Sequence, residues 1–181
     1  MAPERDQVRE KMRRAYERGR VRDALMRTLP VAVIAGLACL IGERRPGELT
    51  LAGVLCGTAF LFLWRGRHLG RGVLPGLLAG AVPFAAAHLA RNAGHACAGG
   101  SCYSTCVLAC IGGAVIAGVV IGRFARRSEA PRLSWLAAGT VALLTGSLAC
   151  ACIGLTGIVG LVAGVMVAST PMVLIAAPRP G

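Results

Sequence analysis

The second half of the chain contains the feature that most restricts its fold. No charged side chain occurs from residue 133 to residue 177, a run of 45 residues. A helix needs about 20 residues to cross a hydrocarbon layer of about 30 Å, because each residue adds about 1.5 Å. The run is too long for one crossing and long enough for two, and the glycines of IGLTG (153–157) indicate a tight turn between them. We therefore predict a two-helix transmembrane hairpin.

The composition of the whole chain is typical of a membrane protein. Of its 181 residues, 55% are hydrophobic and only 15% are charged, whereas soluble domains average about 25% charged residues. The net charge of +12 could indicate a nucleic-acid partner, but aromatic residues make up only 4% and no RNA- or DNA-binding motif occurs. Stacking platforms and a groove-reading element are both missing. The expected partner is the lipid bilayer, with no direct binding of nucleic acid.

Six apolar stretches are candidates for transmembrane helices. They cover residues 24–42, 49–64, 73–90, 103–122, 133–153 and 156–177. We therefore predict an all-α, polytopic membrane protein with about six transmembrane helices. A basic amphipathic arm (1–23) forms a short cytoplasmic helix, the transmembrane domain covers 24–177, and a cytoplasmic tail covers 178–181.

The basic residues predict the orientation of this domain. If the N-terminus is inside, seventeen of the twenty Lys and Arg residues lie on the inner side: in the arm, at the inner edge of the first span (Arg27), in the short segments between spans two and three and between spans four and five, or in the tail. Only Arg44, Arg45 and Arg91 lie on the other side. Short cytoplasmic segments carry such an excess of Lys and Arg. Both termini are therefore expected in the cytoplasm of a bacterial cell, with the protein in the inner membrane.

With this orientation, all eight cysteines fall in the outer half of the membrane domain. They are Cys39, Cys56, Cys97, Cys102, Cys106, Cys110, Cys150 and Cys152. Four of them occur in the stretch HACAGGSCYSTCVLAC (95–110), which begins with His95. Thiols on that side of an inner membrane face an oxidising compartment, where disulfides form and persist.

Three of these cysteines are four residues apart and line one face of the fourth span if its helix begins early enough. In Cys102, Cys106 and Cys110, neighbouring Cβ atoms would be about 5–6 Å apart, whereas a disulfide requires about 3.8 Å. They are poorly placed to pair with one another. Pairing with another helix is one alternative, for example Cys106 with Cys150 or Cys152.

Two further roles remain open for this cluster. The thiols, together with His95, could bind a soft metal ion, and Cys97 and Cys102 could close a small outer loop as a disulfide. A purely structural role is the competing interpretation, because cysteine packs well as a small apolar residue. No CxxC pair and no HExxH motif occurs, so no cofactor is assigned beyond a candidate soft metal ion.

The membrane domain offers no sign of catalysis or ion-coupled transport. Spans two to six contain no Asp, Glu, Lys or Arg away from their ends, whereas coupled carriers need an ionisable group at depth. No catalytic serine, carboxylate pair or phosphate loop occurs, so an enzyme is not expected. Glycines four residues apart permit close helix packing or a homodimer. These pairs are Gly53/Gly57, Gly76/Gly80, Gly118/Gly122 and Gly160/Gly164.

The N-terminal arm is predicted to be helical. Val8, Met12 and Tyr16 are four residues apart, and opposite charges at Glu10/Arg14 and Arg13/Glu17 have the same spacing. A basic helix next to a membrane favours contact with anionic lipid. The alternative is that the apolar stripe of Val8, Met12 and Tyr16 docks a cytoplasmic protein.

The layout as a whole resembles the membrane-integral anti-sigma factors of the NrsF kind. The shared features are six spans in under 200 residues, a short cytoplasmic arm, no enzymatic motif and cysteines near the outer face. The resemblance implies a protein that holds a sigma factor inactive at the inner membrane until the outer cysteines register heavy metal or oxidant. Members of that family carry a cysteine pair, whereas this chain has eight cysteines.

Two other classes of function fit the same residues. A small heavy-metal-handling membrane protein would pass a soft ion inward between thiols, and would need thiols continuing toward the cytoplasm. A structural or assembly protein would use its cysteines as bracing disulfides. The residues for a redox or metal response are Cys97, Cys102, Cys106, Cys110, Cys150, Cys152 and His95.

Overall fold

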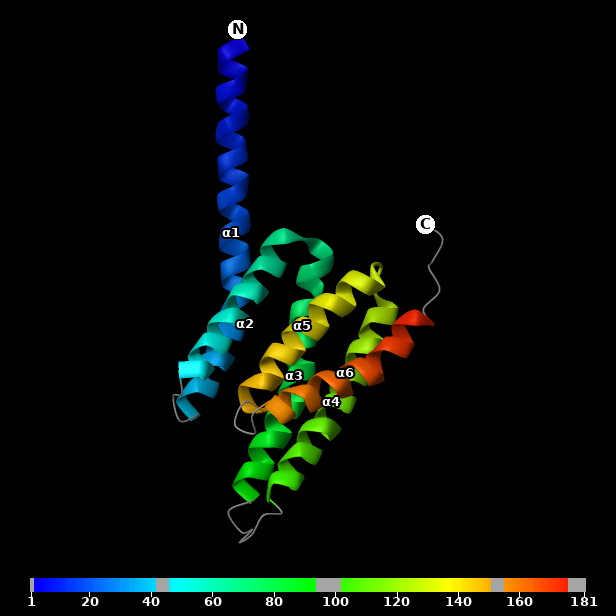
Figure 1. Ribbon diagram of the computed structural model, residues 1–181. Helices are drawn as coiled ribbons and strands as arrows, with labels where there is room; N and C mark the ends of the chain where they lie inside the picture. Colours follow the sequence, from blue (N-terminus) through cyan, green and yellow to red (C-terminus); the bar gives the residue numbers. More distant parts are fainter. Residues whose placement is uncertain (1, 42–45, 94–101, 151–154, 176–181) are drawn as a thin grey trace.

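The computed structural model describes residues 2–41, 46–93, 102–150 and 155–175 (Figure 1). This part of the chain forms six α-helices and no strand. The helices are α1 (Ala2–Ile41), α2 (Pro46–Arg65), α3 (Arg67–Ala93), α4 (Cys102–Arg127), α5 (Pro131–Cys150) and α6 (Leu155–Leu174). The all-α prediction is confirmed.

Four of the helices are long and apolar enough to cross a membrane. The qualifying stretches are Gly47–Arg65, His68–Ala90, Val107–Arg127 and Leu155–Leu174. Over the described residues, α1 and α5 are not among them. The chain thus has the helices of a membrane protein, but the count of six transmembrane helices is not confirmed.

The helices run alternately up and down, so their connections gather at two ends (Figure 1). We call the lower end in Figure 1 the cysteine end: it holds the end of α1, the start of α2, the facing ends of α3 and α4, and the facing ends of α5 and α6. The opposite end, with the arm and the turns at 65–67 and 127–131, is called the basic end. The alternation expected from the sequence is therefore present.

Close packing of α3 on α5 and of α4 on α6 builds the centre of the bundle. A Cβ atom added to Gly76 of α3 would lie 2.5 Å from the carbonyl oxygen of Ala138 in α5. One added to Gly164 of α6 would lie 2.7 Å from the Cβ of Ala114 in α4. Only glycine permits these approaches. By contrast, Gly53 of α2 faces open space.

Polar side chains inside the bundle are satisfied locally or across one helix pair. The indole of Trp135 in α5 donates a 2.9 Å hydrogen bond to the Oγ of Ser169 in α6. The hydroxyl of Thr145 donates to the carbonyl of Val141 one turn earlier. Such bonds keep buried donors paired where water is absent.

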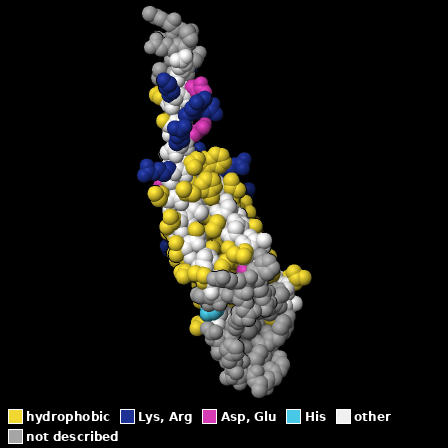
Figure 2. All heavy atoms as spheres, turned by 90° about the vertical axis from the view of Figure 1, so that its left-hand side faces the viewer, with side chains coloured by type: hydrophobic (Ala, Val, Ile, Leu, Met, Phe, Trp, Pro, Cys, Tyr) yellow, Lys and Arg dark blue, Asp and Glu magenta, His cyan; other side chains and the backbone are white. Residues whose placement is uncertain are grey.

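The arm and the first predicted span form one continuous helix, α1, which projects beyond the bundle (Figure 1). Ion pairs link Arg13 with Glu17 at 3.1 Å and Arg14 with Glu10 at 2.5 Å, as the spacing predicted. The helix continues through Pro30. Figure 2 shows Lys and Arg side chains gathered along this arm and hydrophobic side chains over the body below it. The body surface is therefore suited to contact with lipid.

Candidate functional site at the cysteine end

Cys110 is the best-defined cysteine of the bundle. It lies in the third turn of α4, is fully buried, and packs with Ala87 of α3 and Ala149 of α5. It is disulfide-bonded, and its partner lies outside the residues whose side chains are described. A covalent link therefore begins at the point where α3, α4 and α5 meet.

The remaining cysteines of the predicted cluster are described less fully. Cys102 and Cys106 lie on α4, and Cys150 is the last residue of α5, but their side chains are not described. Because α4 begins at Cys102, the early helix start that would align Cys102, Cys106 and Cys110 on one face is present. The predictions for Cys97, Cys152 and His95 fall outside the described residues.

A second pair of thiols, not selected from the sequence, lies at the same end of the molecule. Cys39 near the end of α1 and Cys56 in the third turn of α2 are both free and half-buried. The thiol of Cys39 donates to the carbonyl oxygen of Glu48 in α2 over 3.9 Å, so it lies at the contact between α1 and α2. The sequence placed both at the outer level, but it gave no reason to pair them, because pairing depends on the contact between α1 and α2.

Glu48 is the second feature that the sequence did not indicate. Its side chain lies in the first turn of α2 and is only 8% exposed. Its Oε2 atom has no hydrogen-bond partner in the part of the chain that the structure describes. The helix dipole stabilises an acidic residue in the first turn of a helix, which helps to offset the burial of this side chain.

The described residues contain no group of three or more His, Cys, Asp or Glu side chains arranged to hold a metal ion. The candidate soft-metal ligands of the cluster, apart from Cys110, have side chains outside that description. What the described part does present is one disulfide-bonded cysteine and two free thiols at the same end of the bundle.

The predicted protein-docking stripe lies at the far end of α1. Met12 is 61% exposed and Tyr16 is 70% exposed. Val8 lies one turn earlier on the same helix, and its side chain is not described. The stripe therefore offers two exposed side chains on a helix that reaches the cysteine end.

Comparisons with protein-family models, with curated proteins and with solved structures find no match for this chain.

Proposed function

We propose that this chain is a regulator in the bacterial inner membrane that responds to redox state or to a soft metal ion through its cysteine end. In this proposal all six helices span the membrane, both termini are cytoplasmic and the cysteine end faces the periplasm. The cytoplasmic arm holds a sigma factor, as the resemblance to NrsF-type anti-sigma factors implies. The carrying observation is that one end of the bundle holds both oxidised and reduced cysteines, namely Cys110 and the pair Cys39 and Cys56.

The proposed orientation in the membrane supports a chemical role for the disulfide-bonded Cys110 and the free thiols of Cys39 and Cys56. Disulfides persist in the periplasm, whereas cytosolic thiols are kept reduced. The arm and the turns at 65–67 and 127–131 lie at the opposite end of the bundle from the end of α1 and the starts of α2 and α4, which carry Cys39, Cys56 and Cys110. This is the arrangement that the excess of Lys and Arg in cytoplasmic segments predicts. A signal arriving at the periplasmic side would therefore reach the cysteines first.

Continuity of α1 provides a route from the cysteines to the arm. One 40-residue helix carries Cys39 near its end and Met12 and Tyr16 near its start. At about 1.5 Å per residue such a helix is about 60 Å long. It packs chiefly on α2 and makes few contacts with the rest of the bundle. A change in the α1–α2 contact would therefore move the arm as a rigid rod.

Oxidation supplies such a change. Peroxide can take two electrons and two protons from the thiols of Cys39 and Cys56, forming one S–S bond and two molecules of water. This bond would join α1 covalently to α2, and a thiol would restore the reduced pair by exchange. Binding of a soft metal ion by the same thiolates, with release of their protons, would couple the two helices in a similar way.

The test compares gene expression in cells that carry replaced cysteines. One variant replaces Cys97, Cys102, Cys106, Cys110, Cys150 and Cys152 by alanine, and a second replaces Cys39 and Cys56. A control replaces Thr58 of α2, which is half-buried, by alanine. We expect the response to peroxide or to a soft metal ion to be lost in at least one cysteine variant and kept in the control. A full response in both cysteine variants would refute the proposal.

A bracing role of the cysteines is the second candidate, because Cys110 is completely buried at a junction of three helices. It predicts that the six-cysteine variant is less abundant in the membrane and that any change in expression follows that abundance. Immunoblots of the same cells separate the candidates. If a cysteine variant is present at normal abundance but no longer changes gene expression in response to oxidant, bracing is excluded as the sole role of the cysteines.

A further inference from the structure

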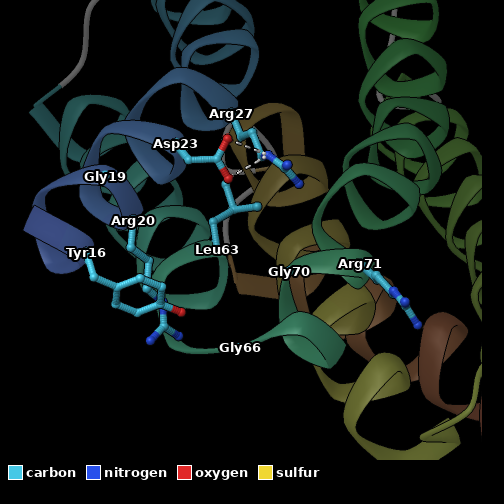
Figure 3. Close-up of a pocket in the computed structure, with 9 residues that line it drawn as sticks. All are labelled: Tyr16, Gly19, Arg20, Asp23, Arg27, Leu63, Gly66, Gly70 and Arg71. Carbon is cyan, nitrogen blue, oxygen red and sulfur yellow. Dashed lines mark hydrogen bonds and ion pairs between the residues drawn. The ribbon is translucent and has the colours of Figure 1, made fainter. Parts of the chain in front are cut away.

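A hollow of about 750 Å³ lies at the basic end, between α1 and the turn that joins α2 to α3 (Figure 3). From α1 it is lined by Tyr16, Gly19, Arg20, Asp23 and Arg27. From α2, α3 and their connection it is lined by Leu63, Gly66, Gly70 and Arg71. Its volume lies within the range of about 300–1,000 Å³ typical of small-molecule sites.

The charges around this hollow do not balance. Asp23 is its one acidic lining residue, and it pairs with Arg27 at 3.1 Å. Arg71 pairs with Glu129, which lies outside the lining, at 2.9 Å. Arg20 has no ion pair within the described part of the chain, and in Figure 3 its guanidinium lies beside the ring of Tyr16. Of the three arginines that line the hollow, Arg20 is therefore the one whose charge is not paired within the described residues.

We propose that this hollow binds the phosphate group of an anionic phospholipid from the leaflet at the basic end. The guanidinium group of Arg20 matches phosphate oxygens with paired N–H donors, and Arg27, whose Nε is bonded to Asp23, adds a second positive charge to the same hollow. The hydroxyl of Tyr16 adds a further donor from the same helix. Gly66 and Gly70 add no side chain to the opposite wall, which leaves room for a headgroup between Leu63 and Arg71.

Apolar side chains next to the hollow favour a lipid over free phosphate as the source of that group. Leu63 lines it directly, and Trp64, the next residue of α2, is 43% exposed. Leu25 and Leu29 are exposed further along α1 toward the bundle, on the face of the helix opposite to Arg20, and do not line the hollow. Tryptophan is typical of the membrane interface, and exposed leucines suit acyl chains. Basic pockets between helices at the cytoplasmic side bind anionic headgroups in the same manner.

The proposal is independent of the sensing role, because it concerns the opposite end of the bundle and needs no cysteine. It assigns the junction of arm and bundle a lipid ligand, which would fix the direction in which α1 leaves the membrane. A variant that no longer binds lipid at this site can still be tested for its response to oxidant, so the two proposals can fail separately.

The test uses the full-length protein purified in detergent and native mass spectrometry with added lipid. Phosphatidylglycerol is titrated against phosphatidylcholine, and inorganic phosphate and glycerol 3-phosphate are added as competitors. The pocket variant combines R20Q with R27Q. The control variant combines R18Q with R22Q, which removes the same charge from exposed positions of α1 that do not line the hollow.

We expect one tightly held phosphatidylglycerol on the wild-type protein, with phosphatidylcholine weaker by at least tenfold. Each arginine near a headgroup strengthens binding about fivefold, so the pocket variant should weaken phosphatidylglycerol binding by roughly 25-fold. The control should change it by less than about threefold, because its charges act from outside the site. Equal elution volumes on size exclusion would show that the three proteins keep the same fold.

Three results would overturn the proposal. The first is equal binding of the two lipids to the wild-type protein. The second is an equal loss in the pocket and control variants, which would mean that the arm attracts anions without a site. The third is displacement of the lipid by inorganic phosphate at concentrations equal to those of the lipid, which would identify free phosphate as the ligand.

Discussion

Replacing Gly76 by alanine tests whether the contact between α3 and α5 holds the bundle together. The added Cβ would lie 2.5 Å from the carbonyl oxygen and 2.9 Å from the Cα of Ala138. Both atoms belong to the backbone of α5, so no flexible side chain can move aside, and the two helices must separate locally. Overpacking of this kind costs about 1–3 kcal/mol.

A matched replacement exists on α2. Gly53 is exposed and has no neighbouring atom within 4 Å of an added Cβ, so alanine there should cost nothing. In both positions alanine gains about 0.5–1 kcal/mol of helix stability over glycine. The expected difference between G76A and G53A is therefore the overpacking cost alone, about 2 kcal/mol, or roughly 30-fold in the unfolding equilibrium.

The assay is reversible unfolding in mixed detergent micelles with an increasing fraction of dodecyl sulfate, followed by tryptophan fluorescence. G76A should unfold at a lower dodecyl sulfate fraction than the wild type, and G53A at the same or a higher fraction. If the two variants differ by less than about 0.5 kcal/mol, which is within the usual spread of surface substitutions, the packing account of α3 and α5 is wrong.

Three further outcomes are expected from the described contacts. S169A removes the acceptor of the Trp135 indole and should lower the free energy of unfolding by about 1–3 kcal/mol, with altered tryptophan emission, whereas unchanged stability would show that the bond does not form. Cys110 should resist alkylation in the unfolded oxidised protein and react after reduction, and alkylation without reductant would disprove its disulfide. In a double-mutant cycle, R71Q and E129Q should show a coupling energy below about 1 kcal/mol, because both side chains are largely exposed, and a larger value would indicate an ordered pair.

Helix content and the order of the bundle were predictable from the sequence because they depend on local properties. Charges mark the ends of the apolar stretches, and the uncharged 45-residue run divides into α5 and α6 as its length requires. The ion pairs of the arm follow from the spacing of opposite charges. The continuity of α1 through Gly19 was less predictable, because glycine weakens a helix by only about 1 kcal/mol and the neighbouring residues are strong helix formers.

Contacts between helices could not be predicted, since they depend on which faces meet. The glycine pairs predicted close packing of helices. Only the structure shows that Gly76 contacts α5, whereas no atom lies within 4 Å of a Cβ added at Gly53. The position of the Cys39 thiol against the backbone of Glu48 depends in the same way on the contact between α1 and α2. The burial of Glu48 could not be predicted from the sequence, because a carboxylate at the end of a span is ordinarily solvated.

The most direct test of the account is the side of the membrane on which the cysteine end lies. Intact cells would be treated with a membrane-impermeant maleimide, with and without prior reduction, and the modified cysteines would be identified by mass spectrometry. A variant with all eight cysteines replaced and E129C added reports on the basic end, where Glu129 is exposed. We expect cysteines of the native chain to be labelled in intact cells, with more labelling after reduction, and E129C to be labelled only after the membrane is broken. Labelling of E129C in intact cells, with the native cysteines protected until lysis, would contradict the periplasmic sensor.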